Sequence, residues 1–320
     1  MTGQGESLIP ASGIVVIDKP RGPSSHQVTA WAGSILGRRV GHAGTLDPRV
    51  SGVLVVMFGS AVRLAPVLLS HDKEYICLMR LHGDVPRKAV DTVAREFVGR
   101  VYQRPPRRSA VKRSLRIREL HEIEILDMEG RLVLFRVRCD AGTYIRTLCV
   151  HMGYALGVCA HMQELRRIRS GPFGEAESVS LYELADAVAA AREEGDPGPL
   201  QRMLLPPASA ITDLPKVIIR DTAVDAICHG AMLAGVGVVR VEGEFRKGEA
   251  VAIMTGRGEF VGLGEPLVEL IGVEARGARA GRRPHHSPDA TWHLPTGLDG
   301  ATPVDIINRP ARQLMMHILC

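Results

Sequence analysis

Two short runs of uninterrupted apolar residues near the N-terminus constrain the fold of this 320-residue chain most strongly. The first reads Ile-Val-Val-Ile at residues 14–17, and the second covers residues 52–58 without a polar or charged side chain. Apolar runs of this length are typical of strands that are buried inside a sheet. We therefore expect an α+β domain with a mixed sheet.

A helix is expected between the two apolar runs. Ser24 or Ser25 can cap its N-terminus, and Gly37 can end it. Its apolar residues recur at helical spacing and are expected on one buried face. They are Val28, Trp31, Ile35 and Leu36.

Periodicity and turn residues predict the elements that follow. We expect strands at residues 73–81, 120–127 and 132–139, and helices at residues 60–69, 89–97, 143–156 and 161–168. A capping box from Ser180 to Glu183 begins a further helix.

Residues 41–48, Gly-His-Ala-Gly-Thr-Leu-Asp-Pro, place one carboxylate in a constrained loop. Gly41 and Gly44 permit a left-handed backbone or the close approach of another segment, and Pro48 favours an extended conformation at Asp47. An isolated Asp-Pro beside glycines is usually a simple turn. The sequence contains no phosphate-binding loop, no dinucleotide fingerprint and no His-Glu-x-x-His motif. A reaction run by one carboxylate, without cofactor or metal, is the chemistry that remains.

Residues 104–118 carry seven cations and no acidic residue. The cations are Arg104, Arg107, Arg108, Lys112, Arg113, Arg116 and Arg118. Unpaired like charges repel one another, so this segment is typical of a surface that faces a phosphate backbone. A solvated basic face without function is the alternative. The formal net charge of +5 also suits a polyanionic partner, and the low aromatic content of 4% favours recognition of RNA by shape and phosphates over base stacking.

The Asp47 loop and four further segments, taken in order, resemble the motifs of the TruB-type pseudouridine synthases. The four segments are DKPRGPSSH at residues 18–26, KEY at 73–75, GTYIR at 142–146 and ELRR at 164–167. The resemblance is nearest to the archaeal relatives of dyskerin, the catalytic subunits of box H/ACA guide-RNA particles. It implies an enzyme that converts uridine to pseudouridine in tRNA or in guide-selected rRNA. The implied partners are these RNAs, the guide RNA and the small accessory proteins of the particle.

By this resemblance, Asp47 is the nucleophile and Arg146 is the cation that keeps its carboxylate ionised. Tyr75 matches the tyrosine on which the extruded base stacks, although a tyrosine in a strand is also ordinary core. The substrate pocket or its support is expected to include His42, Lys19, Tyr144 and Leu165. The basic segment matches a mobile loop that closes over RNA, with contacts from Arg104, Arg107, Arg108, Lys112, Arg113 and Arg116.

After residue 214 the pattern changes to short strands with one helix at about 222–228. Residues 221–231 and 247–255 resemble the PUA domain, an RNA-binding module. The expected organisation is a short tail at 1–12, a catalytic domain at 13–192, a linker at 193–214, a barrel-like PUA domain at 215–271 that lacks its closing strand pair, and a disordered tail rich in Arg and Gly at 272–320.

A cytoplasmic location is expected because the sequence has no signal peptide or membrane-length apolar run, and its six cysteines form no C-x-x-C pair. A metal pair at His285 and His286 is not expected, because no carboxylate or cysteine stands at ligand spacing.

Two alternatives to the guided enzyme stay open. One is a stand-alone tRNA synthase of the bacterial kind. The other is a non-catalytic RNA-binding scaffold, which would not need Asp47, Arg146 and Tyr75.

Overall fold

The computed structural model describes residues 9–104, 114–267, 270 and 306–307, and for the last two it describes the backbone only. The chain divides into two compact units, Met1–Thr212 and Asp213–Cys320.

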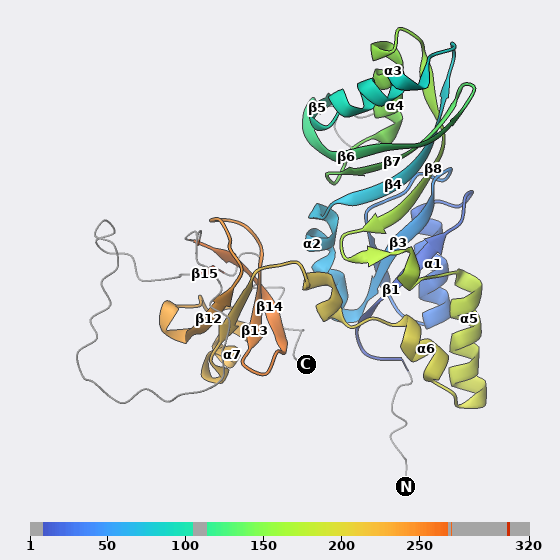
Figure 1. The fold of residues 1–320 in the computed structure, drawn as a ribbon. Coiled ribbons are helices and arrows are strands. Elements are labelled where there is room, and N and C mark those ends of the chain that lie inside the picture. The colour runs from blue at the N-terminus through green and yellow to red at the C-terminus, as the bar shows by residue number, and fades with distance from the viewer. Residues whose placement is uncertain (1–8, 105–113, 268–269, 271–305, 308–320) are drawn as a thin grey trace, which may run out of the picture. The chain divides into compact units, whose positions relative to one another are not determined.

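Within its described residues, the first unit is built on one ten-stranded mixed sheet (Figure 1). The strand order is β10-β1-β3-β8-β4-β7-β6-β5, with β2 paired to β3 and β9 paired to β8. The strands are β1 (Gly13–Lys19), β2 (Val40–Ala43), β3 (Ser51–Phe58), β4 (Lys73–Leu81), β5 (Gly99–Gln103), β6 (Arg116–Glu129), β7 (Leu132–Cys139), β8 (Ala160–Ser170), β9 (Phe173–Gly174) and β10 (Ser178–Val179). The two predicted apolar runs form β1 and β3, which pair antiparallel from Gly13 opposite Phe58 to Lys19 opposite Gly52.

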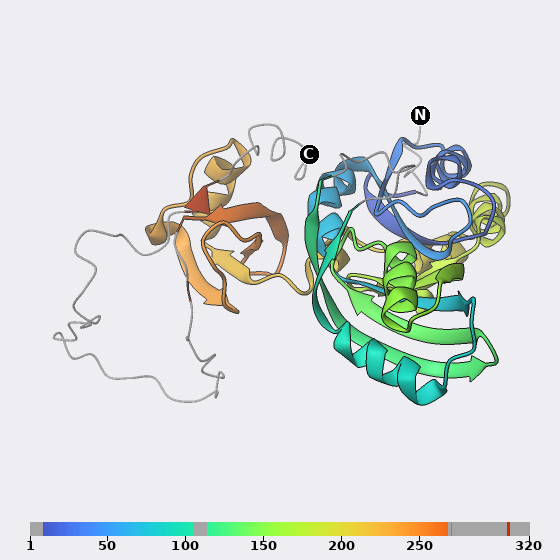
Figure 2. The same cartoon turned by 90° about the horizontal axis from the view of Figure 1, so that it is seen from above.

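The helices pack on the sheet in two groups (Figures 1 and 2). One core joins α3 and α4 to β4, β6 and β7, and another joins α1, α5 and α6 to β1 and β3. The α-helices are α1 (Ser25–Leu36), α2 (Ala65–Ser70), α3 (Arg87–Glu96), α4 (Ile145–Ala155), α5 (Leu181–Ala189) and α6 (Gly198–Met203). Short 3-10 turns are η1 (Gly59–Leu64), η2 (Glu175–Glu177) and η4 (Pro207–Ile211), and η3 (Ala190–Glu194) is a π-turn. No helix among the described residues has the length and apolar character that a membrane crossing requires.

Helix α1 begins and ends as predicted, but its buried face differs from the prediction. The Ser24 hydroxyl accepts a hydrogen bond from the Gln27 amide at 3.2 Å, and Gly37 ends the helix with a φ of 64°. Trp31, which was expected in the core, is 47% exposed. The buried stripe instead includes small or polar residues, Ser25, Thr29 and Ala32 together with Val28 and Leu36, because α1 packs close to the sheet.

The predicted helix at residues 161–168 is wrong, because these residues belong to strand β8. Residues such as Gln, Glu, Leu and Arg favour a helix locally, but tertiary pairing overrides such weak preferences. Strand β8 lies between two neighbours, parallel to β3 and antiparallel to β4. Gly52 of β3 makes this pairing possible, since a Cβ at its φ of +101° would lie 2.1 Å from the carbonyl oxygen of Arg167.

The ends of the first unit are more ordered than the sequence predicted. Ile9, expected in a tail, is only 7% exposed and joins the core of α1, α5 and α6. The segment 193–214, expected as a linker, contains α6 and η4, and the side chain of Leu200 in α6 is completely buried. Charge, Gly and Pro predicted a linker here, but Leu200, Met203 and Leu204 pack this segment against the core.

In the second unit, one sheet has the order β12-β11-β13-β14-β15. Its elements are β11 (Lys216–Ile219), α7 (Asp221–Cys228), η5 (Gly235–Gly237), β12 (Val238–Glu242), β13 (Val251–Thr255), β14 (Phe260–Pro266) and β15 (Ile306–Ile307). The short strands expected after residue 214 are present as β11, β12, β13 and β14, and the helix expected at about 222–228 is α7. One pairing was not predicted. In it, Ile306 pairs with Pro266 and Ile307 pairs with Glu265, both in β14. The rest of the predicted disordered tail lies outside the described residues.

We predict that Leu200→Ala destabilises the first unit by about 2–5 kcal/mol, since the substitution leaves a cavity in a packed core. The control is Gln201→Ala on the exposed side of the same helix, which should cost less than about 0.5 kcal/mol. Calorimetric unfolding of the two variants measures the difference. Equal and small effects would mean that α6 is a loosely attached linker.

Candidate active site

The carboxylate of Asp47 is presented on a short loop between β2 and β3. Strand β2 includes Gly41, His42 and Ala43, so the loop begins only at Gly44, later than predicted. Gly44 has a φ of +78°, a conformation that glycine adopts without strain. Leu46 and Val50 are buried on either side of Asp47, whose side chain is 58% exposed. The loop therefore anchors itself by two apolar side chains and turns the carboxylate outward.

Helix α1 holds this loop through Ser25, whose side chain is completely buried. Its hydroxyl donates to the Leu46 carbonyl oxygen at 3.0 Å and accepts from the Leu46 amide at 2.8 Å. One hydroxyl thus satisfies both backbone groups of the residue before Asp47. Since buried backbone groups must be paired, this contact fixes the position of the loop relative to α1.

Lys19, at the end of β1, holds the other side of the loop. Its buried ammonium group donates to the carbonyl oxygens of Val50 at 2.7 Å and Pro20 at 2.9 Å, and reaches that of Pro48 at 3.4 Å. Burial lowers the pKa of Lys19, while the charge on Asp47 acts in the opposite direction. Lys19 therefore binds the loop backbone on both sides of its end, at Pro48 and Val50.

Arg167 of β8 is the buried centre of the site, with 1% exposure. Its guanidinium donates to the carbonyl oxygens of Gly44 and Val53, each at 2.8 Å, and Tyr75 stands opposite Arg167 in the pairing of β4 with β8. Burial lowers the pKa of Arg167, and the contact with Tyr75 opposes this shift. One side chain therefore links the Asp47 loop, β3 and β4.

Arg146 forms an ion pair with Asp47 through its Nη2 atom and the Oδ2 atom of the carboxylate. Arg146 lies in the first turn of α4, as predicted, and its side chain is 47% exposed. The start of this helix is held by Gln103, whose buried amide accepts from the Tyr144 amide at 2.8 Å and donates to the Tyr144 carbonyl oxygen at 3.2 Å. Tyr144 thus contributes the fixed backbone from which Arg146 extends.

Tyr75 and Leu165 lie on the paired strands β4 and β8, and both are half-buried beside the core of α3 and α4. Burial raises the pKa of Tyr75, so its hydroxyl stays neutral. A half-buried phenol ring next to an apolar side chain can receive a flat ligand.

His42 on β2 and His26 on α1 meet edge to face, with ring centroids 5.0 Å apart. The His42 Nε2 atom is 3.3 Å from the Thr45 hydroxyl oxygen. Burial lowers the pKa of His42, and the nearby His26 and Arg167 add to this effect. His42 is therefore a neutral side chain that contacts the loop.

Of the predicted RNA contacts, only two fall within the described residues. Arg104 is exposed at the end of β5, and Arg116 begins β6. Arg107, Arg108, Lys112 and Arg113 lie outside the described residues.

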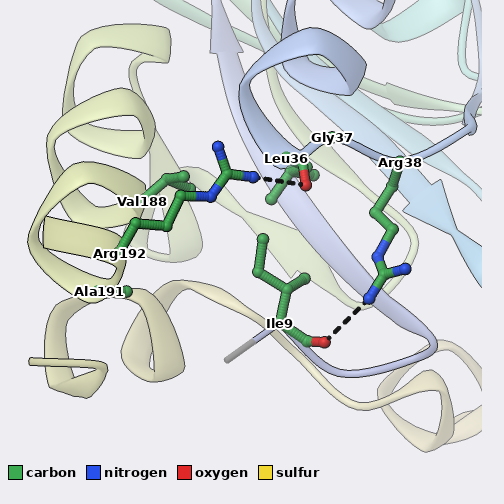
Figure 3. A pocket seen from close by; sticks show the side chains of 7 residues that line it. All are labelled: Ile9, Leu36, Gly37, Arg38, Val188, Ala191 and Arg192. Atoms are coloured by element: carbon green, nitrogen blue, oxygen red, sulfur yellow. Dashed lines mark hydrogen bonds between the residues drawn. The ribbon is translucent and has the colours of Figure 1, made fainter. Parts of the chain in front are cut away.

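A cavity of about 200 Å³ lies elsewhere, between the C-terminal ends of α1 and α5 (Figure 3). Its lining consists of Ile9, Leu36, Gly37, Arg38, Val188, Ala191 and Arg192. The two arginines donate to the carbonyl oxygens of Ile9 and Leu36, each at 3.3 Å. None of the predicted site residues lines this cavity, so it is separate from the Asp47 site.

Sequence analysis missed three residues that hold the site, Ser25, Gln103 and Arg167, because each works by hydrogen bonds to backbone far away in sequence. Ser25 was considered only as a helix cap. Arg167 lies within the ELRR segment, but the sequence carries no signal that it is buried.

Comparison with known proteins identifies the family. Residues 34–87 and 81–145 match the N-terminal domain of the TruB family of pseudouridylate synthases. Residues 146–212 match the C-terminal domain of tRNA pseudouridylate synthase B, and residues 215–278 match the PUA domain.

Two archaeal relatives named probable tRNA pseudouridine synthase B are similar along most of their length. The protein from Archaeoglobus fulgidus is 52% identical over 258 residues, which cover 80% of this chain and 79% of the relative. The protein from Methanosarcina barkeri is 50% identical over 252 residues, which cover 78% of this chain and 75% of the relative.

Two solved structures have a similar fold. A Cbf5-Nop10-Gar1 complex contains a chain with a TM-score of 0.77 and 49% identity, covering 80% of this chain and 78% of that one. An H/ACA ribonucleoprotein bound to a substrate RNA containing 2′-deoxyuridine contains one with a TM-score of 0.75 and 46% identity, with coverage of 80% and 78%. The predicted α+β synthase fold followed by a PUA domain is confirmed. The chain therefore belongs to the TruB family and is an RNA pseudouridine synthase.

Proposed function

We propose that Asp47 is the nucleophile of this synthase, with Arg146 as its counter-charge and Tyr75 as the receiver of the extruded base. The ion pair between Asp47 and Arg146 is the observation that carries the proposal. It joins an exposed carboxylate to a cation in a protein whose family isomerises uridine.

The reaction needs one anionic nucleophile and no net change in composition. The bond between N1 and C1′ breaks, the base turns, and a bond forms between C5 and C1′. The proton on C5 leaves and N1 gains one. Asp47 can start this sequence by attacking either C1′ or the pyrimidine ring, and both routes balance.

Arg146 stabilises the ionised form of Asp47 when RNA covers the site. Desolvation alone raises the pKa of a carboxyl group, and a guanidinium within hydrogen-bond distance opposes that shift. Because Arg146 is itself positioned by the first turn of α4, the counter-charge arrives with the fold and needs no rearrangement.

Tyr75 provides a flat surface for a uridine that has left its stack. Base-aromatic stacking contributes about 1–3 kcal/mol, which offsets part of the cost of extruding the base. Tyr75 stands opposite Arg167 on the neighbouring strand, and Tyr75 and Leu165 pack against the same apolar core. His42 contacts the Asp47 loop from the other side.

We infer that the substrates are tRNA and guide-selected rRNA. The relatives from A. fulgidus and M. barkeri are named for tRNA, and the similar solved structures are of an H/ACA particle with substrate RNA and of a complex with Nop10 and Gar1. By analogy, the partners are a guide RNA and small accessory proteins of that kind. An RNA-modifying role and free thiols also agree with a cytoplasmic location.

We predict that Asp47→Asn keeps RNA affinity but slows isomerisation by at least about 100-fold, a loss of about 2.7 kcal/mol in transition-state stabilisation. Release of tritium from RNA labelled at uridine C5 measures the rate. The matched control is Asp84→Asn, because Asp84 forms an exposed ion pair with Arg131 in the same unit, 2.7 Å from Oδ1 to Nε. Substantial activity in Asp47→Asn would assign the nucleophile elsewhere. Loss in both variants would point to a general effect of charge.

We also predict that the basic segment contacts phosphates. The combined change of Arg107, Arg108, Lys112 and Arg113 to Gln should weaken RNA binding and flatten its salt dependence, by up to about one unit of log K against log [salt] per lost contact.

The control for this experiment changes three arginines and one lysine at exposed positions around α3, namely Arg87, Lys88, Arg95 and Arg131. It alters the net charge by the same amount. If both variants lose the same slope, the effect comes from net charge and the segment makes no specific phosphate contacts.

A further inference from the structure

Outside the Asp47 site, three metal-ligating side chains converge on one point of the first unit. They are Asp72, just before β4, His121 in β6 and Asp140, just after β7. The His121 Nε2 atom is 3.3 Å from Oδ1 of Asp72 and 3.2 Å from Oδ1 of Asp140. Among the described residues, this is the one group of three or more such side chains with ligand atoms within 4.8 Å of one another.

The second oxygen of each carboxylate is held by another group. Asp72 Oδ2 accepts from Arg138 Nη1 at 3.2 Å, and Asp140 Oδ2 accepts from the Glu119 amide at 2.9 Å. Each carboxylate therefore turns its remaining oxygen, Oδ1, toward His121. Partners of this kind orient the ligands in protein metal sites.

The His121 Nε2 atom is buried, yet no described group forms a well-aligned hydrogen bond with it. The two carboxylate oxygens lie within hydrogen-bonding distance of this nitrogen, but neither satisfies the angles of a hydrogen bond to it. The two distances from the nitrogen to the oxygens, 3.3 and 3.2 Å, match the edges of a coordination shell with bonds of about 2.0–2.2 Å. The spacing thus suits a cation shared by the three side chains.

We propose that Asp72, His121 and Asp140 bind a divalent transition-metal ion, for which Zn²⁺ is the best match. One imidazole and two carboxylates are ordinary Zn²⁺ ligands, whereas Mg²⁺ favours oxygen alone. The side chains are 23–40% exposed, so an ion can enter and water can complete the shell. Arg138 also faces Asp72, and Lys73 follows it in sequence, so the affinity should be moderate.

The bound ion would have a structural role. Asp72 lies three residues before Tyr75 on the chain, and Asp140 opens the turn that leads to α4 and Arg146. The backbone of Asp140 already supports this turn, since its carbonyl oxygen accepts from the Thr143 hydroxyl at 2.7 Å. A metal bridge would therefore tie β4 and β6 to the start of α4. Of the proposed catalytic residues, Tyr75 lies on β4 and Arg146 on α4.

The test is calorimetric titration of the full-length protein with ZnCl2 alone, at about pH 7.5 so that histidine is neutral. Thermal unfolding with and without Zn²⁺ provides the second measurement, because an ion that binds the folded state raises Tm. We expect binding of one ion per chain, a higher Tm, and little response to Mg²⁺. His121→Gln and Asp72→Asn should each weaken Zn²⁺ binding at least about tenfold. Changing a residue that only orients a metal ligand already lowers metal affinity about 10- to 100-fold, so the loss of a ligand should cost at least the lower figure.

Other histidines supply the controls. The exposed His82 and His161 side chains lie close together, with Nε2 of His82 2.7 Å from Nδ1 of His161. His285 and His286 are adjacent in sequence. His82→Ala and a double His285→Ala, His286→Ala variant should keep the high-affinity ion and the rise in Tm. The proposal is wrong if Zn²⁺ does not raise Tm, or if the rise persists in both His121→Gln and Asp72→Asn. Two variants are used so that one that fails to fold does not decide the result.

Discussion

The buried guanidinium of Arg167 is the interaction on which the active site depends. A charge in the protein interior is costly unless hydrogen bonds compensate it, and Arg167 donates to the backbone oxygens of Gly44 and Val53 and stands opposite Tyr75. Those partners belong to the Asp47 loop, β3 and β4. Removing the guanidinium would leave buried acceptors unpaired, at about 1–3 kcal/mol each. The loop and the base-receiving strand are therefore held in register by one side chain.

Around this centre, three further supports reach the catalytic groups from different elements. Lys19 from β1 and Ser25 from α1 hold the backbone on either side of Asp47, and Gln103 from β5 holds the start of the helix that carries Arg146. The Asp47 carboxylate and its partner Arg146 remain substantially exposed, unlike the buried residues that support them. Rigid support with an open face is what a preorganised site for a large polyanionic substrate requires.

The sequence predicted the buried strands, the cap of α1 and the order of the motifs, because these depend on local chemistry and on resemblance. The predictions were wrong where contacts with residues far away in the sequence determine the secondary structure or the burial of a side chain. Residues 161–168 favour a helix by composition, but pairing with β3 and β4 makes them a strand, in which Arg166 binds Asp18 on one face and Arg167 enters the core on the other. Leu200 and Ser25 were misjudged for the same reason, since their burial comes from contacts that no local pattern records.

In the proposed mechanism, a loop fixed by buried hydrogen bonds presents Asp47 for attack. Single-turnover tritium release by Ser25→Ala tests this support, because Ser25 is completely buried and its side chain bonds the backbone of Leu46 within the loop. We expect unchanged RNA affinity and a rate lowered about tenfold or more, because a lost buried hydrogen bond costs about 1–3 kcal/mol. Ser34→Ala, which removes an exposed hydroxyl from the same helix, should leave the rate unchanged. A full rate in Ser25→Ala would show that the loop does not need this support.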